Sequence, residues 1–598
     1  MAHGPPAQRS AWEPFDAGRV GSWAILGLLV GLPPASFLPH PFLRLVLLAG
    51  AYFVFLCSLA RGAQVKRWSL SGDALALALG VVVFWAFASA LFALDRHAAV
   101  LSAGQVLAYA LLALAAGRQA REDTFAARAA WAVAAGGAFV AGATLLAPHG
   151  PNGELVGPLG GANAAAAYFL LSGPLTAALV VRGGPQRGLA ALSLVLQAAC
   201  FALCRSRGAF FGAGVALGVL LALRWPGRRT LRRAAGLGLA LALLAAGGAL
   251  FFAELSPQSS SLEHRLFIWR AGLRIVAQRP AVGAGPGNFA RAFRHSRPEY
   301  LGNSYVLAIA QDAHNELLHT AAELGAPGAV AAAAAFALAL AGAWRRAATE
   351  DKPLAIAVAW AIGAWGANGM VNCSLHQPAV AATLAVLVGL GWARRGESAG
   401  ETPFAPRPWL RWALVIAAAV ALGGLGARAV RHAAARTYAA RGDYTRALRW
   451  DGGWSEAALG YAREVGDAAP QAAERVLRAA LARTPKDPEL HHAYAVVAAR
   501  LGEERAACAH LAAAAELDPF NPYFQRDLAR ALLREGKRSE ARQALARAVR
   551  LFELTLEVAE ARYGPQSEEA AGVREELRAA RALLSGAGDG KNRANRAL

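Results

Sequence analysis

A histidine at the start of a long apolar segment has the type and position that chemistry requires. His314 comes two residues after Asp312, which is expected to cap the helix that begins there. The helix dipole disfavours imidazolium at this end, so His314 should stay neutral near pH 7 and be able to accept a proton. The same helix end suits an anion such as a diphosphate. The alternative is a hydrogen bond to a lipid headgroup, and His319 is a second, weaker candidate on the same helix.

Arginines in two places are candidates to bind that anion. Arg205 and Arg207 belong to the short polar island Arg205-Ser206-Arg207-Gly208, between two apolar runs. Arg265 belongs to a segment whose apolar residues recur at helical spacing; these are Leu262, Leu266, Trp269, Leu273 and Val276. That spacing predicts an amphipathic helix at the membrane surface, with Arg265 at the edge of the apolar stripe and Arg270 away from it. The alternative is a basic helix whose arginines contact lipid phosphates.

Three glycine- and asparagine-containing segments could shape such a site. Gly283-Ala284-Gly285-Pro286-Gly287 lacks the Lys-Ser/Thr of a nucleotide-binding loop, so we interpret it as a tight turn in which Gly287 takes a positive φ. Gly325 to Gly328 should permit a kink and close helix packing. Asn163 could hydrogen-bond a sugar, although a contact with a neighbouring helix is the alternative.

The elements that hold these residues are helices in a membrane. The chain has 598 residues, 56% hydrophobic and 17% charged, in many long apolar runs. This composition predicts an all-α, polytopic membrane protein. The formal net charge of +21 is concentrated in short loops, as topology signals are, so nucleic-acid binding is not expected. The five cysteines have no zinc-ligand spacing, and neither a metal, a cofactor nor a disulfide framework is predicted.

Runs long enough to cross the bilayer number about thirteen, and their loops suggest an orientation. The expected spans are 21–39, 41–60, 72–94, 97–117, 126–147, 161–181, 188–204, 208–224, 231–253, 315–344, 353–372, 377–393 and 409–428. Every even-numbered loop is basic, which places those loops and residues 1–20 in the cytoplasm. The membrane domain, 21–428, would then present a large loop, 254–313, on the outer side of the membrane. The first run shows no convincing cleavage site and is expected to remain as an anchor.

The last part of the sequence repeats with a period of 34 residues. Asp487-Pro488 recurs as Asn521-Pro522, Gly502 as Gly536, Ala507 as Ala541 and Ala514 as Ala548. This is the period of tetratricopeptide helix pairs. We therefore predict a helical solenoid at 429–585, on the same outer side as the loop 254–313, followed by a disordered tail at 586–598. The solenoid would be either a scaffold or a docking surface for another protein.

The motifs together resemble the O-antigen ligase and polymerase superfamily of bacterial membrane enzymes. Ser206-Arg207-Gly208 is similar to its S-R-G element, and Arg265 with Trp269 is similar to its R-x-x-x-W element. Arg279 to Gly287 resembles the glycine-rich stretch that follows. His314-Asn315, nine residues, and then Gly325 and Gly328 resemble its H-N-x9-G-x-x-G signature. Ala329 departs from the residue that many ligases carry at that position.

The resemblance implies a location in the bacterial inner membrane, with the loop 254–313 and the solenoid 429–585 in the periplasm. It also implies a metal-independent transfer of a glycan from undecaprenyl diphosphate, with inversion, to an acceptor hydroxyl. The acceptor would be lipid A-core, another glycan or a protein. His314 would act as the base, while Arg207 and Arg265 would stabilise the departing diphosphate. Arg205, Asn163, Arg270 and Asn315 would contact substrates, and Gly285, Gly287, Gly325 and Gly328 would shape the backbone. Repeat-unit polymerisation and a non-enzymatic transporter or assembly scaffold remain alternatives.

Overall fold

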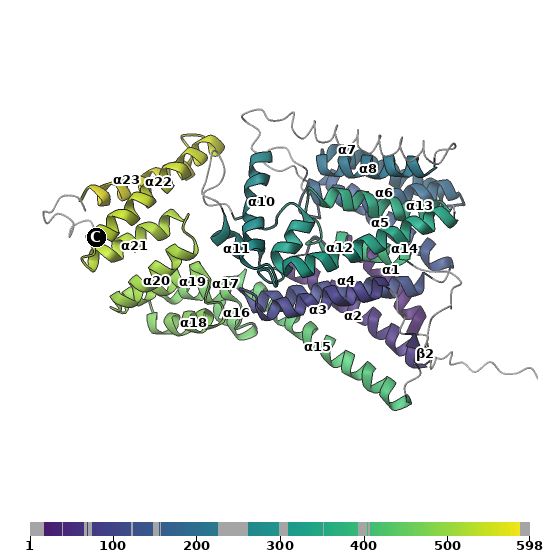
Figure 1. Cartoon of the computed structure of the whole chain (residues 1–598), viewed down its shortest axis with the longest axis horizontal. Helices are drawn as coiled ribbons and strands as arrows, with labels where there is room; N and C mark the ends of the chain where they lie inside the picture. Colours follow the sequence, from purple (N-terminus) through teal and green to yellow (C-terminus); the bar gives the residue numbers. More distant parts are fainter. Residues whose placement is uncertain are drawn as a thin grey trace, which may run out of the picture.

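The computed structural model describes residues 17–38, 40–64, 68–69, 74–120, 123–147, 155, 157–224, 261–297, 309–350, 352–392, 403–404 and 407–586. The described chain is helical except for one short antiparallel pair, β1 (Trp68–Ser69) with β2 (Pro403–Phe404). The all-α prediction is therefore confirmed. Figure 1 shows a body of long, roughly aligned helices, with a separate group of shorter helices at one end of it.

A helix occupies each expected membrane span that falls within the described residues. These helices are α1 (Ala17–Ala35), α2 (His40–Gln64), α3 (Ala74–Leu91), α4 (Arg96–Gln119), α5 (Asp123–Leu146), α6 (Ala162–Arg182), α7 (Arg187–Leu203), α8 (Arg207–Arg224), α12 (Glu316–Glu350), α13 (Pro353–Gly369), α14 (Pro378–Trp392) and α15 (Pro408–Ala439). Among the described residues, 7 helices are long and apolar enough to cross a membrane. The chain is thus a multi-pass membrane protein. The expected span 231–253, the chain start at 1–16 and the tail beyond Gly586 lie outside the described residues.

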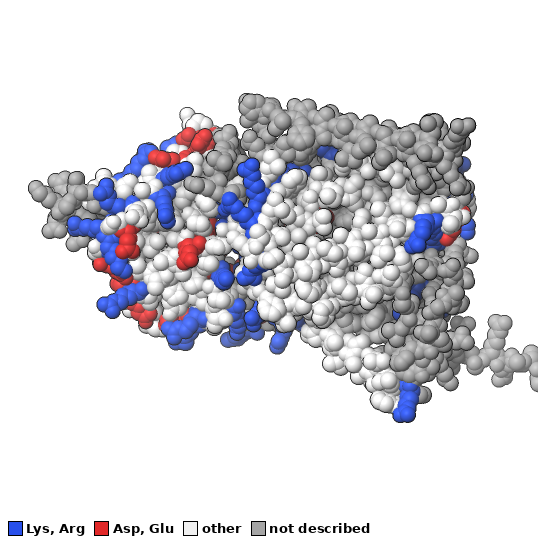
Figure 2. Space-filling model, viewed as in Figure 1, with Lys and Arg blue, Asp and Glu red and all other residues white. Residues whose placement is uncertain are grey.

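Small residues let the membrane helices approach closely. A side chain at Gly212 of α8 would collide with the carbonyl oxygen of Ala364 in α13, and one at Gly389 of α14 would collide with that of Ala113 in α4. Lipid tails are as apolar as the helices, so close backbone packing of this kind replaces the hydrophobic drive that operates in water. The body is almost free of charge on the face that Figure 2 shows, and charged side chains gather at its ends and on the shorter helices.

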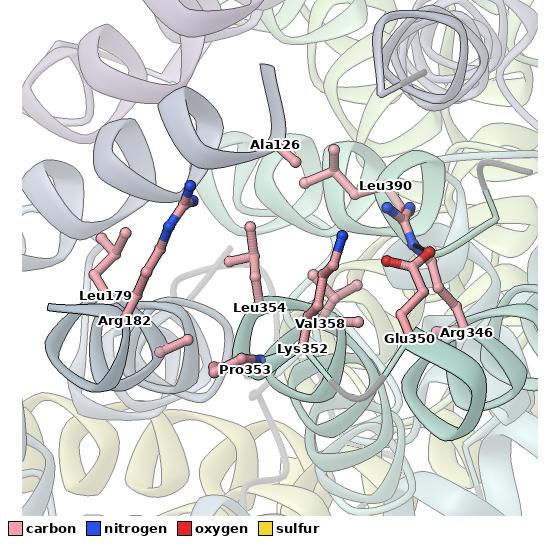
Figure 3. A pocket seen from close by; sticks show the side chains of 14 residues that line it. Ala126, Leu179, Arg182, Arg346, Glu350, Lys352, Pro353, Leu354, Val358 and Leu390 are labelled. Carbon is pink, nitrogen blue, oxygen red and sulfur yellow. Dashed lines mark hydrogen bonds and ion pairs between the residues drawn. The ribbon is translucent and has the colours of Figure 1, made fainter. Parts of the chain in front are cut away.

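The basic loops predicted to share one side of the membrane do lie together. β1 follows α2 and β2 follows α14, so their pairing joins two even-numbered loops. Arg182, at the end of α6, and Arg346 and Lys352, around the end of α12, line one pocket of about 480 Å³ (Figure 3). His314 precedes the opposite end of α12. Which of these two faces is cytoplasmic stays a prediction.

Two short helices on the other face carry the predicted loop. α10 (Ser261–Gln278) crosses the direction of the membrane helices and does not run along them (Figure 1). Its packed face differs from the expected stripe: Ile268, Ala271 and Ile275 are buried, whereas Leu266 and Leu273 are exposed. The buried residues contact α11 (Phe289–Ser296), a helix that the sequence analysis did not single out.

The C-terminal region is a series of antiparallel helix pairs. Its helices are α16 (Tyr444–Trp450), α17 (Ser455–Val465), α18 (Pro470–Arg483), α19 (Pro488–Arg500), α20 (Glu504–Leu517), α21 (Pro522–Arg534), α22 (Arg538–Tyr563) and α23 (Glu568–Gly586). The repeat has a clear structural basis. Asp487 and Asn521 cap α19 and α21 in the same way, and Gly502 and Gly536 have φ of 79° and 78°. Helix α15 runs unbroken from the last span into this solenoid, so the expected boundary at 428/429 falls inside one helix.

The solenoid contacts the membrane body through α11. Arg291 pairs with Asp487, with Glu456 at 3.1 Å and with Asp95 of the α3–α4 connection at 3.0 Å. Arg294 pairs with Glu489, and the buried Arg297 pairs with Asp518 at 2.7 Å. Three arginines spaced three residues apart therefore fix the solenoid against the site-bearing loop.

Candidate active site

Four polar segments from distant parts of the chain meet at one end of the membrane body. They are the start of α8 at Arg207, the first turns of α10 at Arg265, the loop before α12 at His314, and the loop that follows α13 at 370–376. The contacts among them are specific. Arg265 Nη1 donates to the carbonyl oxygen of Val371 at 2.6 Å, and Trp269 Nε1 donates to that of Ala313 at 2.9 Å. The R-x-x-x-W spacing thus places an arginine on one of these loops and a tryptophan on another.

Arg265 lies in a positively charged environment. Burial lowers the pKa of Arg265, and the charge of Arg207 lowers it further, whereas Asp312 opposes the shift. Arg265 is partly desolvated, and the positive charge of Arg207 repels it. An anion between them would remove this penalty, so the arrangement favours a ligand with concentrated negative charge.

His314 is held in a strained backbone conformation next to these arginines. Its φ is 48°, and Arg205 (also 48°) is the other non-glycine residue with a positive φ in the described chain. Such values are costly and tend to occur at functional sites. Asp312 Oδ1 accepts from the backbone N–H of His314 at 2.8 Å and lies 3.3 Å from its Nδ1. The carboxylate therefore orients the ring and leaves Nε2 as the atom that can take a proton.

The protonation of His314 suits a base. Burial lowers the pKa of His314, Asp312 opposes this, and Arg265 and His319 add to the lowering. The imidazole is consequently neutral near pH 7. Its side chain is 36% exposed, so an acceptor can still reach it. His319 contacts Glu323 at 3.6 Å and Phe289, which places it on the packed side of the helix.

The expected helix cap at Asp312 is wrong, because Asn315 caps α12. Asn315 Oδ1 accepts from the N–H of Leu318 at 2.9 Å, while its Nδ2 donates to the carbonyl oxygen of Met370 at 2.8 Å. Both ends of this amide are therefore engaged within the protein. Asp312, three residues before the cap, instead faces His314. The error arose because either residue type serves as a cap and only the fold decides which one does.

The Arg205–Gly208 island is joined to Asn163 and to α13. Ser206 Oγ, in the connection between α7 and α8, donates to Asn163 Oδ1 at 2.8 Å, so Asn163 contacts a neighbouring segment of the protein. A side chain at Gly208 would meet Val371 and the Oδ1 of Asn368. Arg205, Arg207 and Arg270 are exposed. Arg270 lies on the same helix as Arg265 but away from the inward contacts, and nothing in the described chain brings it to His314.

The glycine-rich stretch packs against the kink in α12. Gly325 breaks the helix with φ 73° and ψ 178°, and a side chain there would collide with the carbonyl oxygen of Ala281. Gly285 donates its N–H to the carbonyl oxygen of Glu323 at 2.8 Å, and Trp85 of α3 donates to that of Leu324 at 2.8 Å. The positive φ predicted at Gly287 and the predicted kink are confirmed, and Gly285 also has a positive φ. These glycines set the position of α12, and with it the position of His314.

The loop at 370–376 is a part of the site that the sequence analysis missed. Besides the contacts of Val371 and Met370, the N–H groups of Ser374 and Leu375 donate to Glu316 Oε1 at 2.6 and 2.9 Å. Next to it, Asn368 is fully buried and neither polar atom of its side chain has a hydrogen-bond partner in the described chain. The available signal was the run Asn372-Cys373-Ser374-Leu375-His376, a polar stretch between two apolar spans.

The fold and the site together define a multi-pass membrane protein with two arginines and a histidine at one membrane face. Comparison with known families then identifies it more closely: residues 192–333 match the O-antigen ligase family. The chain thus carries an O-antigen ligase family domain, and that family is a family of enzymes. The match runs from α7 past the α12 kink, so it includes Arg207, Arg265 and His314. No curated protein matches the chain.

One solved structure, titled "Crystal structure of MamA protein", is similar over 26% of this chain and 90% of that chain. The identity is 16% and the TM-score 0.19. The solenoid is defined by its own 34-residue repeat and by its capped helix pairs.

Proposed function

We propose that this protein transfers a glycan from a polyprenyl diphosphate to an acceptor hydroxyl, with Arg207, Arg265 and His314 as catalytic residues. Membership in the O-antigen ligase family supports glycan transfer of the ligase or polymerase type. The donor is expected to be undecaprenyl-diphosphate-linked, at the periplasmic face. The acceptor is lipid A-core or a protein, or, in the polymerase alternative, a growing glycan.

The proposed reaction is a single displacement at the anomeric carbon. His314 Nε2 removes the proton from the acceptor hydroxyl, and that oxygen attacks the anomeric carbon from the face opposite the diphosphate. The bond from carbon to the diphosphate oxygen breaks, and its electron pair leaves with the diphosphate. Arg207 and Arg265 stabilise the charge that develops there, and the product has inverted configuration. Asp312 is a positioning residue that holds His314 Nδ1.

The observation that carries this proposal is the convergence of the segments that hold Arg207, Arg265 and His314, which lie far apart in sequence. Arg265 donates to the carbonyl oxygen of Val371, and a side chain at Gly208 would meet Val371 as well. Trp269, one turn after Arg265, donates to the carbonyl oxygen of Ala313, next to His314. The charge of Arg207 acts on Arg265, and that of Arg265 acts on His314. These observations support a site in which a base and two anion-binding groups act together at one membrane face, as a reaction on a lipid-linked substrate requires. A transporter would instead place its polar groups near the middle of the membrane.

Replacement of His314 tests the base role directly. In purified full-length protein, His314→Ala should lower glycan transfer by about 10²–10⁴-fold, the contribution of a general base. His295→Ala on α11 is the matched control, because His295 is exposed and lies outside the site. Both variants should insert and unfold like the parent protein. Full activity in a correctly folded His314→Ala protein would exclude the base role.

Deletion of the gene separates the acceptors. Polymer retained on its lipid carrier, with bare lipid A-core, would identify a ligase. Single repeat units on lipid A-core would identify a polymerase. A missing glycoprotein with unchanged lipopolysaccharide would identify transfer to protein.

A further inference from the structure

A second polar pocket, of about 890 Å³, lies where the membrane body meets the solenoid. Its walls come from the start of α4, from α15, and from the connections α16–α17 and α18–α19. On α15 it is lined by Gly424, Ala427, Arg428 and Arg431, whose spacing places them on one face of the helix. In Figure 2, basic side chains gather along this border between the white body and the solenoid.

The pocket contains many more positive than negative groups. Its basic residues are Arg96, Arg279, Arg428, Arg431, Arg483 and Lys486, and its acidic residues are Asp95 and Asp451. None of these basic residues forms an ion pair with a carboxylate in the described part of the chain. Asp95 is already used: it caps α4 through the N–H of Ala98 and pairs with Arg291 at 3.0 Å.

Asp451 is also used, by two histidines. Its Oδ2 lies 2.8 Å from His97 Nε2 and 2.8 Å from His432 Nδ1, and the three groups could in principle hold a metal ion. The hydrogen bonds argue against a metal. Arg428 Nη2, which can only donate, lies 3.0 Å from His97 Nδ1. A neutral His97 therefore carries its proton on Nε2, the atom that a metal would need, 2.8 Å from Asp451 Oδ2.

The surplus positive charge points to an anion. We propose that this pocket binds a phosphate group, in the form of the anionic headgroup of a membrane lipid. The location supports a lipid, because the membrane-spanning part of α15 is only 11% buried and leads directly into the pocket wall. By contrast, the pocket of Figure 3 supplies its own carboxylate, since Glu350 pairs with Arg346 at 2.6 Å. The proposed site is separate from the active site and does not depend on the proposed reaction.

The test measures lipid binding to the purified full-length protein by native mass spectrometry. The probes are phosphatidylglycerol and, for comparison, zwitterionic phosphatidylcholine. The variant combines Arg96→Gln, Arg431→Gln and Lys486→Gln. These three side chains are exposed, and none forms an ion pair with a carboxylate within the described chain. The control combines Arg542→Gln, Arg547→Gln and Arg578→Gln, which remove the same charge from exposed positions on α22 and α23.

We expect the most tightly bound phosphatidylglycerol molecule to have a dissociation constant at least about tenfold higher in the pocket variant than in the parent protein. In the control variant, that dissociation constant should stay within about twofold of the parent value. Added salt should weaken it as well. Displacement by millimolar inorganic phosphate would show that the phosphate group alone is recognised, and resistance to it would show that the lipid is required; either result supports the site. Equal binding of phosphatidylcholine, or parental affinity in the pocket variant, would overturn it. Glycan transfer is measured separately, and failure of the lipid proposal would leave the proposed reaction unaffected.

Discussion

Arg265 and Arg291 lie on consecutive helices, α10 and α11, yet their surroundings are opposite. Burial would lower the pKa of Arg291, but Asp487, Glu456 and Asp95 outweigh it and raise that pKa above its ordinary value. For Arg265 burial prevails, and Arg207 adds to the lowering. The protein itself neutralises Arg291 with carboxylates, whereas it brings Arg265 under the influence of a second cation, Arg207.

This difference separates arginines that hold the molecule together from arginines that are set up for a ligand. The ion pairs of α11 are complete in the described structure, and their removal should disturb folding or docking. The charges of Arg207 and Arg265 oppose each other near His314, and removal of these arginines should disturb chemistry and leave the fold intact. The predictions below test this division.

The largest expected effect is on catalysis. Arg207→Lys or Arg265→Lys should reduce glycan transfer by roughly 10²–10³-fold, because an ammonium group cannot make the paired contacts of a guanidinium with a diphosphate. The rate is measured on purified protein with a lipid-linked donor, and the unfolding temperature is measured alongside. Arg274→Lys, an exposed arginine of α10, serves as the control and should keep its activity. A large loss of stability in the Arg207 or Arg265 variant would contradict the division.

The next effect is on docking of the solenoid. Arg297 and Asp518 are 3% and 7% exposed, so Arg297→Ala would leave a buried carboxylate without its partner and should cost about 3 kcal/mol. Thermal unfolding and limited proteolysis at the junction report this loss. Arg294→Ala should cost about 1 kcal/mol or less, since its partner Glu489 is 38% exposed.

A double variant sharpens the second prediction. Arg297→Met combined with Asp518→Leu removes both charges and should restore most of the stability, because an apolar pair can replace a buried ion pair. If the double variant does not recover the stability of the parent protein, Arg297 stabilises the junction through contacts other than Asp518, such as the ring of Phe520.

Much of this architecture could be predicted from the sequence, since apolar length and repeat period are local properties. The span 97–117 corresponds to α4 (Arg96–Gln119), and the recurrence of Asp487-Pro488 as Asn521-Pro522 corresponds to two identical caps. The packed face of α10 could not be predicted in this way. Its inward side is chosen by contacts with α11 and α12, which no period within 261–280 records.

The composition of the site was predictable only in part, for the same reason. His314, Arg265 and Arg207 stand out as polar residues beside apolar runs, and a family signature adds to that signal. The loop at 370–376 contributes through backbone groups, Met370 and Val371 by their carbonyl oxygens and Ser374 by its N–H. Backbone contacts leave no trace in residue type. Asp312 was noticed, but its role changed once Asn315 proved to be the cap.

A smaller effect concerns pH. His314 must be neutral to act, so activity should fall as the pH drops through its pKa, and burial places that pKa below the ordinary value. Asp312→Asn removes the group that opposes the lowering, so the acid limb of kcat/KM should move to still lower pH. Loss of the orienting contact should also reduce kcat about tenfold near neutral pH. Arg265→Gln should move the acid limb of its residual activity in the opposite direction. An acid limb that stays in place in both variants would mean that another group titrates.

The smallest expected effect is on two helix caps, Asp487 and Asn521. They occupy equivalent positions in the repeat, but only Asp487 also contacts α11. Asn521 accepts from the N–H groups of Tyr523 and Phe524, and Asn521→Ala should cost about 1 kcal/mol of stability, the value of an N-cap. Asp487 makes the same contacts in α19 and also pairs with Arg291. Asp487→Ala should therefore cost more, and thermal unfolding measures both. In an Arg291→Ala background the docking contribution of Asp487 is absent, so the two substitutions should become nearly equal. A difference that persists there would show that Asp487 stabilises the solenoid itself and is not part of the joint with α11.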